Sequence, residues 1–174
     1  MDTNKCNQNQ PGSSSKEYEI IRLEKTKKVC GLCETYSSSK SENKDLVAIM
    51  SCEGACLRGE VSRRAANKLC FDMYPEQTAR LCLGGAFTKD TGQRNMVRSA
   101  KRVIALEGCP IECASRMMKG VIPDFNPEIV LVDKFYNFNK NLFAINDATE
   151  EELIKYSEEA AANINNVIFG CNVL

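Results

Sequence analysis

The sequence predicts an α/β fold: a small doubly wound, mainly parallel sheet of about four to five strands with helices on both faces. Short continuous apolar runs, typical of strands buried on both faces, alternate with stretches whose apolar residues recur at helical spacing. Such alternation implies right-handed crossovers between parallel strands. The chain has 174 residues, of which 43% are hydrophobic, so it is long and apolar enough to form one domain with a core.

The N-terminal part of the chain lacks this pattern. Residues 1–16 are polar and contain no apolar stretch of the kind found in secretory signal peptides, so we expect a disordered leader. Residues 17–44 hold a Cys-x2-Cys segment and then a polar linker, Ser37–Lys44. The isoleucine and tyrosine content of Tyr18–Leu23 predicts a short strand there.

The α/β metal-binding domain is predicted over residues 45–174. Its first strand, Leu46–Ser51, is a continuous apolar run, and its first helix, Leu57–Asp72, has an apolar residue at every fourth position. Further strands are predicted at Thr78–Leu83, Val103–Leu106 and Ile129–Asp133. Further helices are predicted at Thr91–Arg102, at Ile111–Gly120 with Pro110 at its start, and at Ala148–Ile164 with Asp147 or Thr149 as its cap. The apolar tail Val167–Leu174 is expected to pack on the domain.

The composition excludes several classes of site. The chain has ten cysteines and no histidine, so it cannot build a Ser-His-Asp or Cys-His catalytic arrangement or a histidine-ligated zinc site on its own. The formal net charge is zero, and this balance gives no indication of a nucleic-acid partner. No apolar run approaches the length of a membrane span, so we expect no membrane partner and a cytoplasmic location. Paired cysteines in the cytoplasm more often indicate metal or redox chemistry than disulfides.

Two Cys-x3-Cys pairs, Cys52/Cys56 and Cys109/Cys113, are the strongest candidates for a functional site. Cys52 follows the first predicted strand, a Gly84-Gly85 turn follows the second and Cys109 follows the third. Because the carboxyl ends of parallel strands meet at one edge of a sheet, we expect these residues to converge there. Positions at helix starts favour the thiolate, which is the form that binds metal. Four thiolates suit a tetrahedral zinc site with Zn–S distances of about 2.3 Å, and equally an iron–sulfur cluster.

Auxiliary candidates surround this predicted site. Cys30 and Cys33 have three interpretations: a metal knuckle, a redox pair or no role. Glu107 is interpreted as a hydrogen-bond acceptor for a metal ligand, as a proton-handling group, or as a cap on the following helix. Gly84 and Gly85 would let the backbone approach a ligand closely.

The remaining cysteines are predicted to have no role in the site. Free cysteine is a common small residue of hydrophobic cores, and this structural interpretation is assigned to Cys70, Cys82 and Cys171. Cys6 lies in the predicted leader and is taken as incidental.

Several motifs in a fixed order carry a family resemblance. They are Ser51–Cys56, Arg58–Leu69, Cys82–Ala86 and Ile104–Ala114, and together they span about half of the chain, Leu46–Asp133. They resemble the DGC-domain family, which is named for an Asp-Gly-Cys motif and is associated with zinc binding. The family pattern Asp-Gly-Cys-Pro-x-x-Cys-Ala has Glu107 in place of its aspartate here. The resemblance implies Cys52, Cys109 and Cys113 as family cysteine positions, with Cys56 near a Cys or Ser position, and it implies no particular reaction.

These observations leave three hypotheses open. The first is a cysteine-rich protein that binds a metal ion, preferably zinc, in a structural, sensing or trafficking role. The second is a sulfur carrier or redox enzyme in which Cys109 or Cys52 is a nucleophile that forms a persulfide or a mixed disulfide. The third is an iron–sulfur protein. The sequence identifies no substrate and no protein partner.

Overall fold

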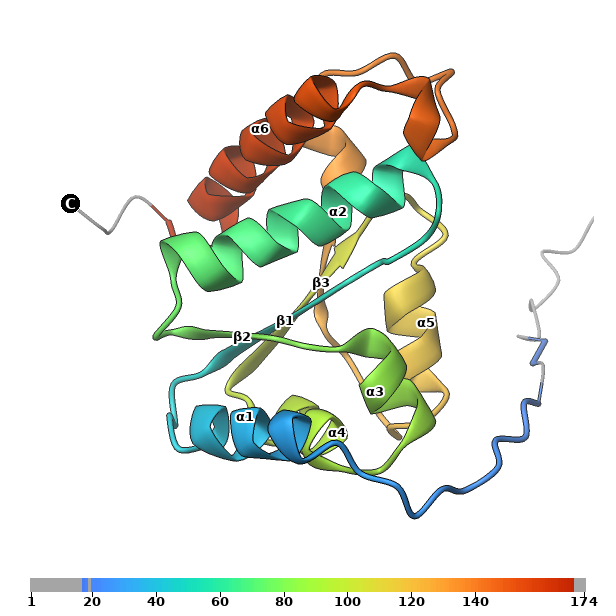
Figure 1. The fold of residues 1–174 in the computed structure, drawn as a ribbon, viewed down its shortest axis with the longest axis vertical. Coiled ribbons are helices and arrows are strands. Elements are labelled where there is room, and N and C mark those ends of the chain that lie inside the picture. The colour runs from blue at the N-terminus through green and yellow to red at the C-terminus, as the bar shows by residue number, and fades with distance from the viewer. Residues whose placement is uncertain (1–16, 19, 171–174) are drawn as a thin grey trace, which may run out of the picture.

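The structure, a computed structural model, describes residues 17, 18 and 20–170. The leader predicted for residues 1–16, with Cys6, lies outside the described residues, as do Cys171 and the end of the predicted tail. Four parallel strands form one sheet in the order β2-β1-β3-β4 (Figure 1). The strands are β1 (Val47–Ser51), β2 (Thr78–Arg80), β3 (Arg102–Glu107) and β4 (Glu128–Leu131). The predicted parallel α/β sheet is therefore confirmed.

Helices cover both faces of the sheet, as predicted (Figure 1). One face is covered by α2 (Leu57–Asn67), which continues as a π-helix, η1 (Lys68–Met73), and by α6 (Glu150–Ile168). The other face is covered by α1 (Gly31–Ser41), α3 (Leu83–Thr88), α4 (Gly92–Ser99) and α5 (Cys113–Lys119). Two short 3-10 helices, η2 (Val132–Lys134) and η3 (Ile145–Asp147), lie between β4 and α6.

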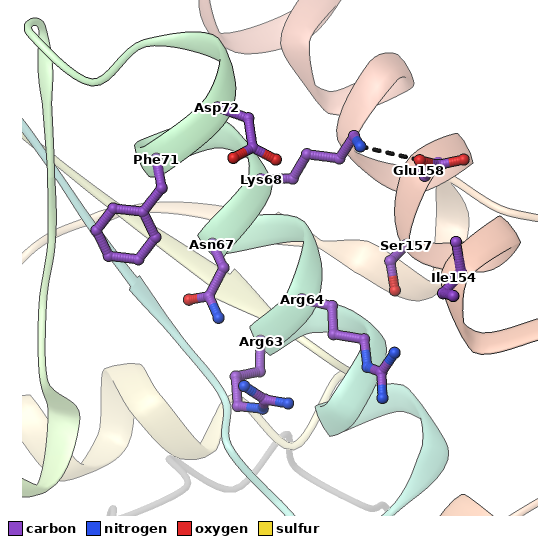
Figure 2. A pocket seen from close by; sticks show the side chains of 9 residues that line it. All are labelled: Arg63, Arg64, Asn67, Lys68, Phe71, Asp72, Ile154, Ser157 and Glu158. Atoms are coloured by element: carbon purple, nitrogen blue, oxygen red, sulfur yellow. Dashed lines mark hydrogen bonds and ion pairs between the residues drawn. The ribbon is translucent and has the colours of Figure 1, made fainter. Parts of the chain in front are cut away.

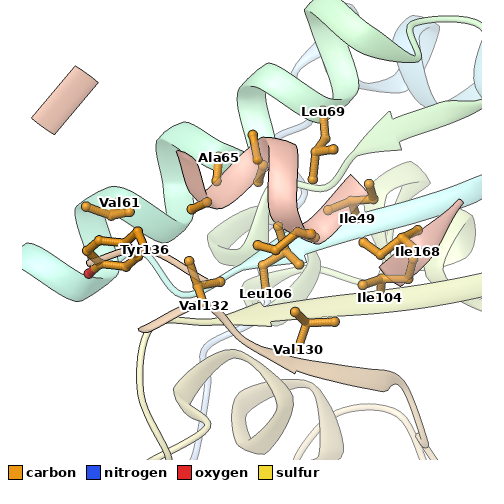
Figure 3. Packing of buried hydrophobic residues seen from close by; sticks show 14 of the residues in the cluster. Ile49, Val61, Ala65, Leu69, Ile104, Leu106, Val130, Val132, Tyr136 and Ile168 are labelled. Atoms are coloured by element: carbon orange, nitrogen blue, oxygen red, sulfur yellow. The ribbon is translucent and has the colours of Figure 1, made fainter. Parts of the chain in front are cut away.

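Alternate residues of the central strands supply the two cores. Ile49, Ile104 and Leu106 pack under α2 and α6, together with Val130 of β4 (Figure 3). Their neighbours in sequence face the opposite core, which α3, α4 and α5 cover. Because both faces are buried, the strands read as continuous apolar runs, and this is why the sequence predicted them well.

The second predicted strand ends earlier than expected, and this prediction was wrong in part. The strand stops at Arg80, and Leu83 already begins α3, so Gly84 and Gly85 lie inside a helix and not in a turn. Two adjacent glycines have low helix propensity, so the sequence alone favoured a turn at this position. The structure forms the helix because Leu83 and Ala86 are buried against the sheet.

The helix after β3 also starts later than predicted. Pro110 and Ile111 lie in a turn, and α5 begins at Cys113. Glu112 has a left-handed backbone with φ of 55°, which interrupts the helical path before Cys113. Predicted ends elsewhere shift by a few residues: α4 stops at Ser99, and the fourth strand gives way to η2 at Val132. The final helix extends to Ile168, and of the two predicted caps, Asp147 and Thr149, Thr149 is the one observed.

The helix α1 begins in the Cys-x2-Cys segment and continues to Ser41, inside the segment predicted as a polar linker, Ser37–Lys44. Its sequence has little apolar periodicity, and tertiary contacts hold it: the Glu34 carboxylate accepts the backbone N–H of Gly92 at 3.1 Å, and the Tyr36 hydroxyl accepts the N–H of Arg80 at 3.0 Å. Ser37 is buried against Gly92. In contrast, the strand predicted at Tyr18–Leu23 is absent from the described residues of that segment, whose isoleucines are exposed. Strand propensity has no effect where no neighbouring strand offers a pairing edge.

No helix in the described part of the chain combines the length and the apolar character that crossing a membrane requires.

Candidate thiol site

The loop after β1 brings Cys52 and Cys56 to either side of Gly54. The register pairs Ser51 with Leu106, and the Cys52 N–H donates to the Leu106 carbonyl at 2.9 Å, so Cys52 sits at the carboxyl edge of the two central strands. An ideal Cβ built on Gly54 would lie 3.6 Å from the Cys56 sulfur and 3.9 Å from the Cys52 sulfur. The sequence-predicted first pair is therefore close in space around one glycine.

Three glycines hold the two cysteine loops against the start of α2. A Cβ on Gly59 would lie 2.8 Å from the Gly54 backbone nitrogen, and a Cβ on Gly108 would lie 2.7 Å from the Arg58 carbonyl oxygen. Such distances are far shorter than ordinary van der Waals contacts, so only glycine fits at either position without a shift of backbone. Cys56 caps α2, and its sulfur accepts the Gly59 N–H at 3.4 Å.

Cys52 lies between both loops. Cys52 is only 6% exposed, and burial raises the pKa of its thiol. The backbone N–H groups of Gly54 and Gly108 oppose this rise in pKa by donating to its thiolate, whereas the charges of Cys113 and Glu107 add to it. One sulfur thus interacts with the backbone of both cysteine loops and is within electrostatic reach of Cys113.

Glu107 caps α5, the helix that begins at Cys113. It is the last residue of β3 and is 0% exposed. Its carboxylate accepts the N–H of Ala114 at 3.2 Å, and the N–H and hydroxyl of Ser115 at 2.7 Å each. The capping interpretation of Glu107 is therefore the one that the structure shows. A carboxylate at a helix N-terminus is electrostatically favourable, and here it fixes α5 to the end of the strand.

The second pair is less enclosed than the first. Cys113 is the first residue of α5 and is exposed, while Cys109 is half-buried in the turn before it. The Cys109 carbonyl accepts the Glu112 N–H at 3.2 Å, which closes that turn. Within residues 17, 18 and 20–170, no three Cys, Asp or Glu side chains are gathered closely enough to hold a metal ion. The four-cysteine ligand set therefore stays a prediction.

A buried arginine at this edge was missed from the sequence. Arg80 ends β2 and is 9% exposed. Its guanidinium donates to the Ser51 hydroxyl and the Glu53 carboxylate, both at 2.6 Å, and to the Asn67 side chain at 3.0 Å. It thereby ties the loop after β1 to α2. The available signal was a charged residue inside the otherwise apolar run of the second strand.

Three further thiols lie at the neighbouring part of the same edge. The helix α1 runs antiparallel to β2, because Asn43 beyond its C-terminus donates to the Glu76 carbonyl before the strand, while Tyr36 meets Arg80 at the strand's end. Cys33, in the first turn of α1, is thereby placed within electrostatic reach of Cys82, and Cys30 directly precedes that turn. Cys82 was predicted to be a core residue, and this was wrong. It is exposed and caps α3, with its sulfur accepting the Gly85 N–H at 3.3 Å.

Cys70 fits its structural interpretation. It is 2% exposed, and burial raises the pKa of its thiol to about 11.

Two grooves in the described part of the chain involve none of these thiols. One, of about 340 Å³, lies between α2 with η1 and α6 (Figure 2). Its basic residues are already paired: Arg63 with Glu60, Arg64 with Glu60 and Glu150, and Lys68 with Glu158. A second groove of about 610 Å³ touches the turn after β3 only through Pro110. We assign neither groove a ligand.

Comparison with known families accounts for the order of these features. A family model described as the DGC domain matches residues 48–163, which run from β1 into α6. The chain belongs to the DGC-domain family. The matched DGC domain contains Cys52, Cys56, Cys109 and Cys113, and leaves Cys30 and Cys33 outside it. No curated protein and no solved structure gives a significant match to the chain.

Proposed function

We propose that this DGC-domain protein binds a metal ion, preferably Zn²⁺, through thiolates at the carboxyl edge of its sheet. The observation that carries the proposal is the placement of Cys52 and Cys56 around Gly54, where an added Cβ would lie 3.9 and 3.6 Å from their sulfurs, at the start of α2, against which Gly108 of the second cysteine loop also packs. The proposed ligands are Cys52, Cys56, Cys109 and Cys113. Thiolates are soft ligands that favour zinc, copper(I) and iron–sulfur clusters over magnesium or calcium.

The surroundings of the four thiols fit such an ion. Gly54 has no side chain to enter the space between Cys52 and Cys56, since a Cβ there would lie within 4 Å of both sulfurs. The backbone N–H groups of Gly54, Gly59 and Gly108 stabilise negative charge on sulfur. Binding would require small rotations of the thiols and movement of the turn that carries Cys109. All four ligands must lose protons, so we expect metal affinity to rise with pH.

The same geometry disfavours Cys52 as the nucleophile of a sulfur carrier. A nucleophilic thiol needs a lowered pKa and access to its substrate. Cys52 is buried, and burial raises its pKa. Metal binding resolves this conflict, because a bound cation stabilises a buried thiolate.

Metal and sulfide analysis of protein purified without oxygen tests the proposal. We expect about one equivalent of zinc per chain, loss of most of it in Cys109→Ser and Cys113→Ser, and retention in the control Cys70→Ala. Iron with acid-labile sulfide and a brown colour would assign the site to a cluster instead of zinc. Less than about 0.3 equivalent of any metal, with all thiols free to react, would refute metal binding.

A further inference from the structure

Cys30 and Cys33 form a second thiol centre outside the matched DGC domain. The helix that carries them is anchored at both ends: the Glu34 carboxylate accepts the Gly92 N–H near its start, and Lys40 donates to the Pro75 carbonyl near its end. The pair is therefore held in a fixed place at the carboxyl edge of β2.

The helix start brings the two thiols together. Cys30 directly precedes α1, and Cys33 is its third residue. These are the N-cap and N3 positions of the helix, which lie within one turn of each other, and the Cys30 side chain makes no capping hydrogen bond. Each of the two side chains shifts the pKa of the other, as neighbouring thiols do, and both thiols are free. No atom lies within 4 Å of a Cβ built on the intervening Gly31, so the turn has room to adjust when a bond forms.

The two thiols differ in a way that separates their roles. The backbone and then the side chain of Cys33 lower the pKa of Cys30 by stabilising its thiolate. The hydrogen bond and charge of Cys30 raise the pKa of Cys33, and the nearby charge of Cys82 adds to this rise. Cys30 is exposed and Cys33 is half-buried. The accessible sulfur is thus the one that ionises first.

We propose that Cys30 and Cys33 form a redox-active dithiol that exchanges with a disulfide supplied by another molecule. The Cys30 thiolate attacks one sulfur of the disulfide R–S–S–R, which forms a mixed disulfide and releases one thiolate that takes a proton to become R–SH. Cys33 then loses its proton and attacks the Cys30 sulfur, which releases the second R–SH. Two protein thiols are oxidised to the Cys30–Cys33 disulfide, and one external disulfide is reduced to two thiols. In the reverse direction, a free dithiol of a second molecule reduces the Cys30–Cys33 disulfide and is itself oxidised to a disulfide.

This centre is independent of the proposed metal site. It uses no residue of the Cys52, Cys56, Cys109 and Cys113 set, and it lies on a helix that precedes the matched domain. The two proposals can therefore fail separately, and one preparation can test both.

Disulfide mapping of the full chain tests the dithiol. Reduced protein, incubated either with zinc or with a chelator, is exposed to oxidised glutathione or, in a parallel arm, to insulin as a polypeptide disulfide, then alkylated and analysed by peptide mass spectrometry. We expect a Cys30–Cys33 disulfide in the wild type and a trapped glutathione adduct on Cys30 in Cys33→Ser. Cys30→Ser should carry at least about tenfold less adduct on Cys33, and Cys70→Ala should behave as the wild type. Reaction in only one arm identifies the source of the disulfide.

Three results would overturn the proposal. The first is a wild type with no Cys30–Cys33 bond in either arm, a measurement that requires no variant to fold. The second is an adduct distributed equally over Cys30, Cys82 and Cys113. The third is a pair that reacts only after zinc is removed, together with a lower zinc content in Cys30→Ser, because both thiols would then be metal ligands.

Discussion

The close approach of Gly59 to Gly54 predicts opposite effects for two glycine-to-alanine substitutions in helices. Gly59 lies in α2, and the Cβ of Gly59→Ala would stand 2.8 Å from the Gly54 nitrogen and 2.9 Å from the Gly54 oxygen. Both are backbone atoms, so no side-chain rotation relieves the overlap. Gly84 lies in α3, and no atom lies within 4 Å of the Cβ that Gly84→Ala would add.

The expected free energies follow from two opposing effects. Alanine in place of a helical glycine contributes about 0.5–1 kcal/mol through helix propensity. Overpacking against fixed atoms costs about 1–3 kcal/mol. We therefore expect Gly59→Ala to lower the free energy of unfolding by about 0.5–2 kcal/mol, and Gly84→Ala to raise it by up to about 1 kcal/mol.

Urea unfolding of the chelator-treated proteins measures both changes without a contribution from bound metal. Gly54 stands between Cys52 and Cys56, so the overlap should also displace the loop that holds both thiols. We therefore expect the Gly59→Ala protein to bind zinc about 10- to 100-fold more weakly than the wild type. A Gly59→Ala protein as stable as the wild type, or shifts of the same sign in both variants, would refute the packing argument.

Four other predictions test residues around the site. Glu107→Gln should lower the free energy of unfolding in urea by about 1–3 kcal/mol, because an amide NH₂ cannot accept the hydrogen bonds that the carboxylate accepts. The control Glu112→Gln should change it by less than about 0.5 kcal/mol. Equal losses in the two variants would contradict the capping role. Arg80→Met should lower the free energy of unfolding by about 1–3 kcal/mol, because it removes the hydrogen bonds that hold the loop after β1. It should also lower the zinc affinity measured by metal titration. An unchanged affinity would show that the loop needs no such anchor. Hydrogen bonds from Arg63, and to a lesser extent from Arg64, hold the pKa of Glu60 at about 2, below its ordinary value of 4.5. The ionised Glu60 should therefore contribute about 1–2 kcal/mol to the free energy of unfolding above pH 4.5, and this contribution should be lost as the pH falls towards 2. Acid titration followed by circular dichroism should show a shallower loss in Glu60→Gln, and identical profiles would argue against this role. Cys70, with a pKa of about 11, should react with a thiol reagent at pH 8 only at the rate of unfolding, and labelling as fast as that of Cys30 would contradict its burial.

The two proposals divide the thiols by environment. Cys52 and Cys56 of the DGC domain flank a loop that backbone packing holds against α2, where a cation would stabilise the negative charge of the buried Cys52 thiolate. Cys30 is exposed at a helix start, where an external disulfide can reach it. One edge of the sheet thus carries an enclosed thiol group and an accessible one.

Local signals in the sequence were enough for most of the fold. The runs at β1 and β3 are apolar because both faces of the sheet are covered there, and the apolar spacing of α2 reflects its single buried stripe. The capping box of Thr149 and Glu152 is likewise a local feature that marks the start of α6. The order of the cysteine motifs was also sufficient to indicate the family.

Other features depend on contacts between distant parts of the chain. The helix α1 has no apolar stripe strong enough to predict, and it forms where Glu34, Tyr36 and Ser37 meet α4 and β2. Cys82 appeared to belong to a strand because its neighbours are apolar, yet their burial belongs partly to a helix that begins one residue later.

The sequence by itself determined that this protein has a parallel α/β sheet and that Cys52 and Cys109 follow its two central strands, because strand burial and motif order are properties of neighbouring residues. Only the tertiary structure decided that Glu107 caps α5, that Arg80 holds the loop after β1, and that Cys33 lies within electrostatic reach of Cys82. Each of these relations joins residues that are far apart in sequence or on different elements. Hydrogen bonding and charge interaction depend on distance in space, which local composition does not encode.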